Sequence, residues 1–303
     1  MLSIVIVNYN GLRFLQGCLT SIERFADTPH EVIIVDNASS DGSVEFIEKN
    51  LPGVRLVSSP ENLGFSGGNN LGAKKAAGDL LLLLNNDTRL LTPLSKAVAE
   101  FEGDERLGAL SCRMYFNDMR FQPSWGYEHL PLRVILTWSG LSRFTSSSMF
   151  REIELNECSY SSRRNVDWAT GAFLMTIKKL WDELGGLDEK YFMYVEDADF
   201  CKRVRMSGYS VVYTPEVEIV HYRGGGKAWG GERALLSQMS SYIVYTDKFH
   251  GALQTFILRA TLALIMAMRS VAYAVLSIAL PSGDLREKRR AFFKAALRLA
   301  GIC

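Results

Sequence analysis

The sequence of 303 residues lacks several features that would place it in a common class of protein. Its 34 Lys and Arg residues nearly balance 33 Asp and Glu residues, so no excess of positive charge indicates nucleic-acid binding. Its five cysteines are scattered and form no CxxC pair, which indicates reduced thiols in a cytosolic compartment rather than a disulfide framework. The apolar segment Leu2–Val7 has no basic residues before it and no cleavage site after it. We therefore expect a buried strand there and no signal peptide.

Common phosphate-binding fingerprints are also missing. The chain contains neither a GxGxxG segment nor a P-loop, which argues against a dinucleotide-dependent dehydrogenase and a P-loop NTPase. No glycine- and lysine-rich triphosphate loop, as expected of a nucleotidyltransferase, lies near the N-terminus, and no internal repeat is present.

What the first 110 residues do contain is an alternation of strand-like and helix-like segments. The predicted strands are short and apolar, and the predicted helices carry apolar residues at helical spacing. The strands are Ser3–Val7, Glu31–Val35, Val54–Ser58 and Leu80–Leu84, and the helices are Leu12–Phe25, Gly42–Lys49 and Gly68–Ala77. This order predicts an α/β fold with a mostly parallel sheet covered by helices on both faces. Ligands of such sheets bind beyond the carboxyl ends of the strands.

The pattern weakens from Gly108 to Asn165, and we expect Ser142–Arg164 to be a long loop. Regular structure resumes with an ordered segment Trp168–Ile177, a helix near Lys178–Leu184, a strand Ser210–Thr214 and a glycine-rich loop Arg223–Gly231.

The C-terminal segment has a different composition. Phe256–Leu280 is long enough to span a bilayer, but Arg269 would lie near its middle at a cost of about 2.5–3.5 kcal/mol. Asp284–Cys303 carries six Lys or Arg against two Asp or Glu, with its apolar residues close to one helical face. We expect this tail to lie on the anionic inner leaflet rather than to cross it. The alternative is a pair of helices packed on the rest of the chain.

Polar residues follow the first two predicted strands. Tyr9, in the turn after Asn8, can stack on a nucleobase, or the turn can be a plain connection between strand and helix. Asp36 ends the second strand, where a carboxylate can accept hydrogen bonds from a base or a ribose. Helix capping explains Asp41 and can explain Ser39, but it requires no carboxylate as early as Asp36. The binding interpretation is therefore favoured for Asp36.

Glycines and side-chain amides lead into the third predicted helix, in the segment Asn62–Asn70. Such groups at a helix N-terminus form a site that is favourable for anions. A tight structural turn is the alternative, and the segment alone does not decide between them.

The run of five leucines Leu80–Leu84 predicts a central buried strand, and Asp87 follows it closely. Mg²⁺ and Mn²⁺ prefer oxygen ligands and commonly take one or two protein carboxylates plus substrate phosphates. Asp87 suits that role, although an Asn-Asn-Asp segment is also common in simple turns.

A second acidic cluster comprises Glu196, Asp197 and Asp199, just before a helix that extends to Gly208. Acidic residues in a first turn are favoured by the helix dipole, which is the structural interpretation. The same dipole favours an ionised carboxylate that can accept a proton. His221 ends an apolar run, where a lone histidine is more often structural than a ligand.

Taken together and in this order, these segments resemble the family 2 glycosyltransferases, and most closely their rhamnosyltransferase-like branch. The matching motifs extend from Leu2 to about Gly226. They are Ser3–Asn10, Val35–Gly42, Asn62–Phe65, Leu84–Asp87, Trp168–Phe173, Gly185–Glu189 and Phe192–Asp199.

The resemblance implies a role for each matching residue. Asp36 would read the base and ribose, Asp87 would bind the metal as the last residue of a DxD-type motif, and Asp197 would be the catalytic base of an ED motif. His221 matches a histidine that also binds the metal in some relatives. Other contacts to the nucleotide sugar are expected from Asn8, Tyr9, Asn62, Gly64, Asn69, Asn85 and Asn86, and contacts to the acceptor or the donor sugar from Trp168, Gly171, Ala172 and Glu196.

The sequence departs from the family pattern in two places. Asn85 and Asn86 stand where many relatives have Asp, so metal binding depends more on Asp87 and His221. After His221 the chain reads Tyr-Arg-Gly-Gly-Gly-Lys, where many relatives carry a hydroxyl residue a few positions on. Arg223, Lys227 and Trp229 in that segment are expected to close over the donor as a lid, unless the segment is a plain surface loop.

The implied protein has the GT-A fold with a C-terminal helical tail. Residues 1–110 would form its nucleotide-sugar-binding half, 111–248 its acceptor-binding and catalytic half, and 249–303 the tail. It would be an inverting hexosyltransferase that uses Mg²⁺ or Mn²⁺, with dTDP-L-rhamnose as the leading donor. The acceptor would be a saccharide or a polyprenyl-diphosphate-linked saccharide, at the cytoplasmic face of the membrane. The alternatives are an inactive nucleotide-sugar-binding protein and a nucleotidyltransferase.

Overall fold

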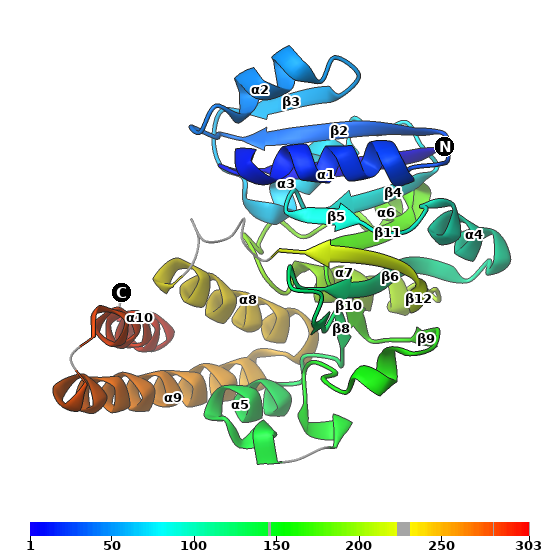
Figure 1. Ribbon diagram of the computed structural model, residues 1–303. Coiled ribbons are helices and arrows are strands. Elements are labelled where there is room, and N and C mark those ends of the chain that lie inside the picture. The colour runs from blue at the N-terminus through cyan, green and yellow to red at the C-terminus, as the bar shows by residue number, and fades with distance from the viewer. Residues whose placement is uncertain (145–146, 223–230, 281, 303) are drawn as a thin grey trace. The chain divides into compact units, whose positions relative to one another are not determined.

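The computed structural model describes residues 1–144, 147–222, 231–280 and 282–302, and the predicted lid residues Arg223, Lys227 and Trp229 lie outside this range. The described chain forms two compact units. Residues 1–127, 153–189 and 196–222 make up the first unit, and the described parts of 128–152, 190–195 and 231–302 make up the second (Figure 1).

A ten-stranded sheet forms the centre of the first unit, in the order β3-β2-β1-β4-β11-β6-β12-β5, with β7 beside β6 and β9 beside β12. The first four strands of this order run parallel to one another, as the strand–helix alternation predicts. β11 is antiparallel to both of its neighbours, and β5 is antiparallel to β12. The strands are β1 Leu2–Asn8, β2 His30–Asn37, β3 Arg55–Ser59, β4 Leu80–Leu84, β5 Thr88–Leu90, β6 Leu107–Tyr115, β7 Phe121–Gln122, β9 Arg164–Asn165, β11 Phe173–Ile177 and β12 Ser210–His221. A separate pair joins β8 Trp125–Gly126 to β10 Trp168–Ala169.

Helices cover both faces of the sheet because successive strand residues point to opposite sides. In β4, Leu82 and Leu84 enter one core, which α1, α2 and α4 cover, whereas Leu81 and Leu83 enter another, which α3, α6 and α7 cover. These helices are α1 Leu12–Phe25, α2 Ser43–Asn50, α3 Gly64–Ala73, α4 Ser95–Gly103, α6 Lys178–Leu184 and α7 Glu196–Met206. The mostly parallel α/β sheet and the central leucine strand are thus confirmed.

Glycines let α3 pack closely on the sheet. A Cβ on Gly72 would lie 2.5 Å from Val5 Cγ1, and one on Gly68 would lie 2.8 Å from Val7 Cγ1. Real Cβ atoms do not approach that closely, so the glycine-rich sequence here serves helix–sheet packing.

Most predicted bounds differ from the structure by one or two residues, and the larger differences are at α3, β6 and β12. α3 covers Gly64–Ala73 instead of Gly68–Ala77, because close-packed glycines leave no apolar period that would mark its start. β6 is a buried strand within the segment whose pattern is weak, and β12 continues past Thr214 to His221 through a register shift. The expected loop Ser142–Arg164 contains short 3₁₀ turns rather than longer helices or strands in its described part.

The second unit is helical, with α5 Pro131–Ser139, α8 Glu232–His250, α9 Ala252–Ala279 and α10 Gly283–Leu299. This confirms that the chain ends in helices. Leu258 and Leu262 of α9 and Phe292 of α10 are buried. α9 is long and apolar enough to cross a membrane by length and composition.

Candidate active site

Asn8 links three segments at the carboxyl ends of the strands. Its Nδ2 donates to Asp36 Oδ1 at 3.2 Å and to Ser39 Oγ at 3.1 Å. Its Oδ1 accepts a hydrogen bond of 2.8 Å from Asn86 Nδ2. Three of the predicted nucleotide-sugar residues, from β1, β2 and the loop after β4, therefore meet at one point. Gly11 lies against this cluster, where a Cβ would come within 2.0 Å of Asn86 Nδ2.

The turns after β1 and β2 hold each other in an uncommon backbone conformation. Asn10 and Ala38 have φ angles of 50° and 64°, which non-glycine residues rarely adopt. Ser39 Oγ accepts from Asn10 N at 3.0 Å, and Asn10 Oδ1 accepts from Ser40 N at 2.8 Å. Strained residues of this kind gather at functional sites when their surroundings fix them. Tyr9 is half-buried in the first of these turns.

Asp36 and Asp41 play different parts in this region. Asp36 is almost fully buried, and its Oδ2 accepts from Ser39 N at 2.9 Å. Asp41 accepts from the N–H of Leu12 at 2.9 Å and of Ser43 at 3.1 Å, the first residues of α1 and α2. The capping interpretation is therefore right for Asp41.

The amide-rich segment before α3 is held by local hydrogen bonds. Asn62 Oδ1 accepts from Gly64 N at 2.9 Å, and Asn69 Nδ2 donates to the carbonyl of Phe65 at 2.9 Å. Asn37, which ends β2, donates to the carbonyl of Gly64 at 2.8 Å. The segment is thereby tied to the end of β2, while Asn62 and Asn69 use part of their hydrogen-bonding capacity within the turn.

Asn70 is a residue that the sequence did not single out. Its Nδ2 donates to the carbonyl of Leu187 at 2.8 Å, and its Oδ1 accepts from Leu187 N at 2.9 Å. This side chain joins α3 to the Gly185–Glu189 motif, 117 residues away in sequence. Its place at the end of the amide-rich segment Asn62–Asn70 was the available signal.

Asp87 and His221 converge although 134 residues separate them. His221 Nε2 lies 3.4 Å from Asp87 Oδ1, and the register of β12 with β5 places His221 opposite Thr88. Asn85 Nδ2 lies 3.4 Å from the same His221 nitrogen. On the other side of the ring, Gln122 Nε2 lies 2.9 Å from Nδ1 and fixes the orientation of the imidazole. No sequence pattern indicated Gln122, because β7 is only two residues long and lies in the weakly patterned segment.

This pair is a chemically suitable start of a site for Mg²⁺ or Mn²⁺. A carboxylate oxygen and an imidazole nitrogen are both ligands of Mn²⁺, and such ions commonly complete their coordination with water and substrate phosphates. Within the described residues, no group of three or more His, Cys, Asp or Glu side chains is placed to hold an ion. A cation here would therefore depend on phosphate oxygens of a bound substrate.

The carboxylate of Asp197 is held by two backbone N–H groups. Gly171 N donates to Oδ2 at 3.0 Å, and Ala198 N donates to Oδ1 at 2.8 Å. Gly171 has to be small, because a Cβ would lie 2.8 Å from the ring of Phe65. The next residue, Ala172, accepts from Asn85 N at 3.1 Å through its carbonyl. Two consecutive residues thus contact the proposed base and the loop that carries Asp87.

Trp168 lies at the start of the same segment, in β10. Its indole N–H donates to the carbonyl of Tyr127 at 2.8 Å, so the ring is fixed in a half-buried position.

The three carboxylates of the acidic cluster have three different environments. Asp199 is fully buried and pairs with Arg203, which also donates to the carbonyls of Leu184 and Gly186. Glu196 is 5% exposed, and its Oε2 has no hydrogen-bond partner among the described residues. Burial, together with the charges of Asp197 and Asp199, raises the pKa of Glu196 well above its ordinary value. Asp197, in contrast, is only half-buried.

The raised pKa of Glu196 predicts a specific pH dependence of stability. In the unfolded chain this residue ionises near pH 4.3, whereas in the folded chain it stays protonated to a higher pH. The free energy of unfolding therefore falls by about 1.4 kcal/mol for each pH unit above pH 4.3. The loss continues until the pH reaches the folded-state pKa. Glu196→Gln removes this dependence, and the variant should gain stability relative to the wild type as the pH rises. Urea unfolding between about pH 4.5 and 7.5 measures the difference.

Glu48→Gln serves as the control, because Glu48 is exposed on α2. Its unfolding free energy should follow the wild type at every pH. Parallel pH profiles for Glu196→Gln and the wild type would show that Glu196 is ionised in the folded protein.

Comparison with known proteins gives a family match and several similar proteins. The model of the family described as Glycosyl transferase family 2 matches residues 3–170. The N-acetylglucosaminyl-diphospho-decaprenol L-rhamnosyltransferase of Mycobacterium tuberculosis is 26% identical over 287 residues, covering 89% of this chain and 92% of that protein. The rhamnosyltransferase WbbL of Escherichia coli K12 is 23% identical, covering 73% of this chain and 83% of that protein.

The fold has a match among solved structures. The mannosyltransferase PcManGT of Pyrobaculum calidifontis, in complex with GDP-Man and Mn²⁺, aligns over 98% of this chain and 86% of its own, with a TM-score of 0.56 and 19% identity. This similarity confirms the GT-A glycosyltransferase fold.

Proposed function

We propose, because the chain belongs to glycosyl transferase family 2, that it transfers a hexosyl or deoxyhexosyl group from a nucleoside-diphosphate sugar to a saccharide acceptor with inversion of configuration. The observation that carries this proposal is the contact of Gly171 with Asp197 and of Ala172 with the loop of Asp87. One short segment thereby joins a carboxylate base to a cation-binding pair.

The donor would bind across the carboxyl ends of the strands. Tyr9 and Asp36 would contact the base and ribose, held in place by the hydrogen bonds of Asn8. The diphosphate would lie at Asp87 and His221, where a bound Mg²⁺ or Mn²⁺ would neutralise the charge that develops on the leaving group.

Asp197 would remove the proton of the acceptor hydroxyl while the oxygen of that hydroxyl attacks the anomeric carbon of the donor sugar. The bond from that carbon to the diphosphate oxygen breaks in the same step, so the product has inverted configuration and no covalent intermediate forms. The hydrogen bonds from Gly171 and Ala198 would hold the carboxylate in one orientation for this transfer. Glu196 would contribute as a neutral neighbour, so that a single negative charge faces the acceptor.

The named relatives support L-rhamnose as the transferred sugar, with dTDP-L-rhamnose as the leading donor. The mycobacterial relative further supports a polyprenyl-diphosphate-linked saccharide as the acceptor. Such an acceptor lies in a membrane, which agrees with a peripheral location on the cytoplasmic face.

Donor binding should be visible without any knowledge of the acceptor. A ligand that binds only the folded state at about 100 times its Kd adds about 2.7 kcal/mol to stability. We expect dTDP-L-rhamnose with Mn²⁺ to raise the melting temperature more than UDP-N-acetylglucosamine or GDP-mannose with Mn²⁺. A thermal-shift screen with and without Mn²⁺ measures this.

The released product separates the alternative functions. A glycosyltransferase releases a nucleoside diphosphate, whereas a nucleotidyltransferase releases pyrophosphate. Donor binding without release of either product, in the presence of lipid-linked acceptors, would favour the inactive binding protein.

A further inference from the structure

α9 in the second unit carries an apolar stripe that the described chain leaves open to solvent. Its members are three, four or seven residues apart, lie on one helical face and are between 48% and 82% exposed. They are Leu253, Ile257, Leu264, Met268, Val271, Val275 and Ile278. The opposite face is buried through Leu258, Leu262 and Met266. A helix that is apolar on its solvent side and packed on its other side suits the surface of a bilayer.

Arg269 does not interrupt this stripe. Its Nε donates to the carbonyl of Trp138 in α5 at 3.0 Å, and its guanidinium lies 5.5 Å from the ring centroid of Phe292 in α10. The charge that the sequence places near the middle of the apolar segment is therefore turned toward protein and held there.

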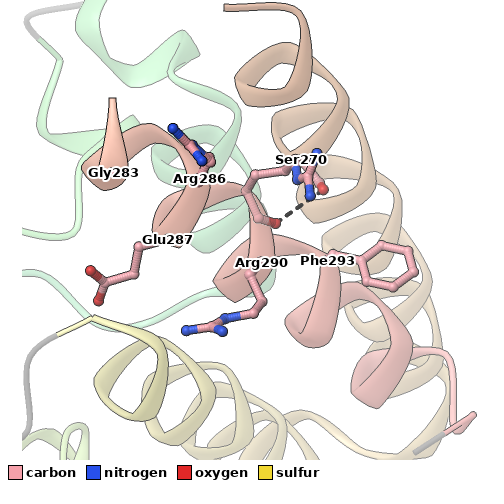
Figure 2. A pocket seen from close by; sticks show the side chains of 7 residues that line it. Ser270, Gly283, Arg286, Glu287, Arg290 and Phe293 are labelled. Carbon is pink, nitrogen blue, oxygen red and sulfur yellow. Dashed lines mark hydrogen bonds between the residues drawn. The ribbon is translucent and has the colours of Figure 1, made fainter. Parts of the chain in front are cut away.

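A cavity of about 710 Å³ lies at the N-terminal half of α10, and Figure 2 shows the side chains that line it. They are Ser270 of α9 and Arg286, Glu287, Arg289, Arg290 and Phe293 of α10, together with Gly283. Three arginines against one glutamate give the lining a positive charge. Ser270 Oγ donates to the carbonyl of Arg289 at 3.1 Å and fixes this part of α10 beside α9.

The arginines differ in how they are paired. Arg290 lies 3.6 Å from Glu232, whereas Arg286 and Arg289 form no ion pair with any described residue. Arg286, Arg290 and Phe293 stand at positions i, i+4 and i+7, so they share one helical face. An exposed aromatic ring beside arginines is a typical composition at a membrane interface.

We propose that this cavity binds the phosphate headgroup of an anionic phospholipid while the α9 stripe inserts into the same leaflet. Arginine is the side chain best suited to phosphate oxygens, because its planar fork donates two parallel hydrogen bonds. Ser270 of α9 lines the cavity, and the next residue along the helix, Val271, belongs to the stripe, so α9 contributes to both features. The proposal rests on the membrane location of the acceptor proposed above, but not on the transferred sugar.

Flotation of the full chain with vesicles tests the proposal. The vesicles are phosphatidylcholine alone or phosphatidylcholine with phosphatidylglycerol. We expect binding to the anionic vesicles to fall by about 30-fold in R286A/R289A, since each basic side chain near an anionic surface contributes about a factor of five. The matched control is K288A/R298A, which removes the same charge from α10 outside the cavity lining. Its binding to the anionic vesicles should fall clearly less than that of R286A/R289A, because Lys288 and Arg298 do not line the cavity.

Each other outcome contradicts the proposal. Equal losses in the two double variants would mean unspecific attraction of a basic helix. Binding of inorganic pyrophosphate to the wild type but not to R286A/R289A, with equal binding of both proteins to the anionic vesicles, would mean a site for free phosphate groups. Binding to neutral vesicles only when they contain a polyprenyl diphosphate would make the acceptor the occupant. Rhamnosyl transfer to a water-soluble acceptor should be unchanged in R286A/R289A, which separates failure of this proposal from failure of the proposed function.

Discussion

Asp197→Asn should lower the rate of sugar transfer by at least about 10²-fold while the affinity for the nucleotide sugar stays within a few-fold of the wild type. An alcohol is a poor nucleophile at neutral pH, and a positioned base contributes typically 10²–10⁴ in rate. The amide keeps the size of the side chain but cannot accept the proton. Transfer measured with saturating donor, together with donor binding by thermal shift, gives both quantities.

The structure also defines the controls for this variant. Both oxygens of Asp197 accept backbone N–H bonds, so the amide leaves one N–H without an acceptor at a cost of about 1–3 kcal/mol. The melting temperature of Asp197→Asn therefore has to be measured beside its activity. Glu196→Gln should retain transfer, because a neutral glutamate and a glutamine differ little. Near wild-type transfer by Asp197→Asn, or loss of transfer in Glu196→Gln with the donor still bound, would refute the assignment of the base.

Asp87→Ala should abolish most transfer, and EDTA should do the same to the wild type. A cation at the diphosphate contributes several kcal/mol of charge stabilisation, so its loss corresponds to at least about 10²-fold in rate. In the wild type, added Mn²⁺ should restore the rate after EDTA, whereas in Asp87→Ala it should not. Transfer assays across a series of Mn²⁺ concentrations measure this.

Two further variants sharpen this experiment. His221→Ala should shift the Mn²⁺ dependence to higher concentration, because the Asp87 carboxylate lies 3.4 Å from the imidazole and would be the remaining protein ligand. Glu48→Ala removes an exposed carboxylate from α2 and should leave the rate unchanged. Full activity of the wild type in EDTA would show that the chain transfers sugar without a metal.

Local sequence determined the framework of the first unit. The five consecutive leucines Leu80–Leu84 predict a central strand, because a strand that is buried on both faces needs apolar residues at every position. α1 and α6 have the predicted bounds, since their apolar residues follow a helical period. The positions of Asp36, Asp87 and Asp197 after strands or at a helix start, and the order of the motifs, were likewise available from the chain alone.

Only the tertiary structure separated the carboxylates of the acidic cluster. Glu196, Asp197 and Asp199 are neighbours on one helix, yet successive helical residues point about 100° apart. Asp197 accepts a hydrogen bond from Gly171, which is remote in sequence. Asp199 pairs with Arg203 one turn along the same helix, and this arginine also donates to the carbonyl of Gly186 in a separate loop. In the part of the chain that the structure describes, Oε2 of Glu196 has no hydrogen-bond partner, and burial raises the pKa of this residue.

The same reason explains Gln122 and Arg269. Gln122 orients His221 because a two-residue strand beside β6 brings it there, and two residues are too short for any period. In the sequence, Arg269 places a charge inside an apolar segment. In the structure, α9 packs against α5 and α10, and the side chain of Arg269 points toward them and away from the apolar stripe. The sequence determines the type of each residue and the spacing of apolar residues around it. The contacts of a side chain, in contrast, are decided by packing between segments that are far apart in the sequence.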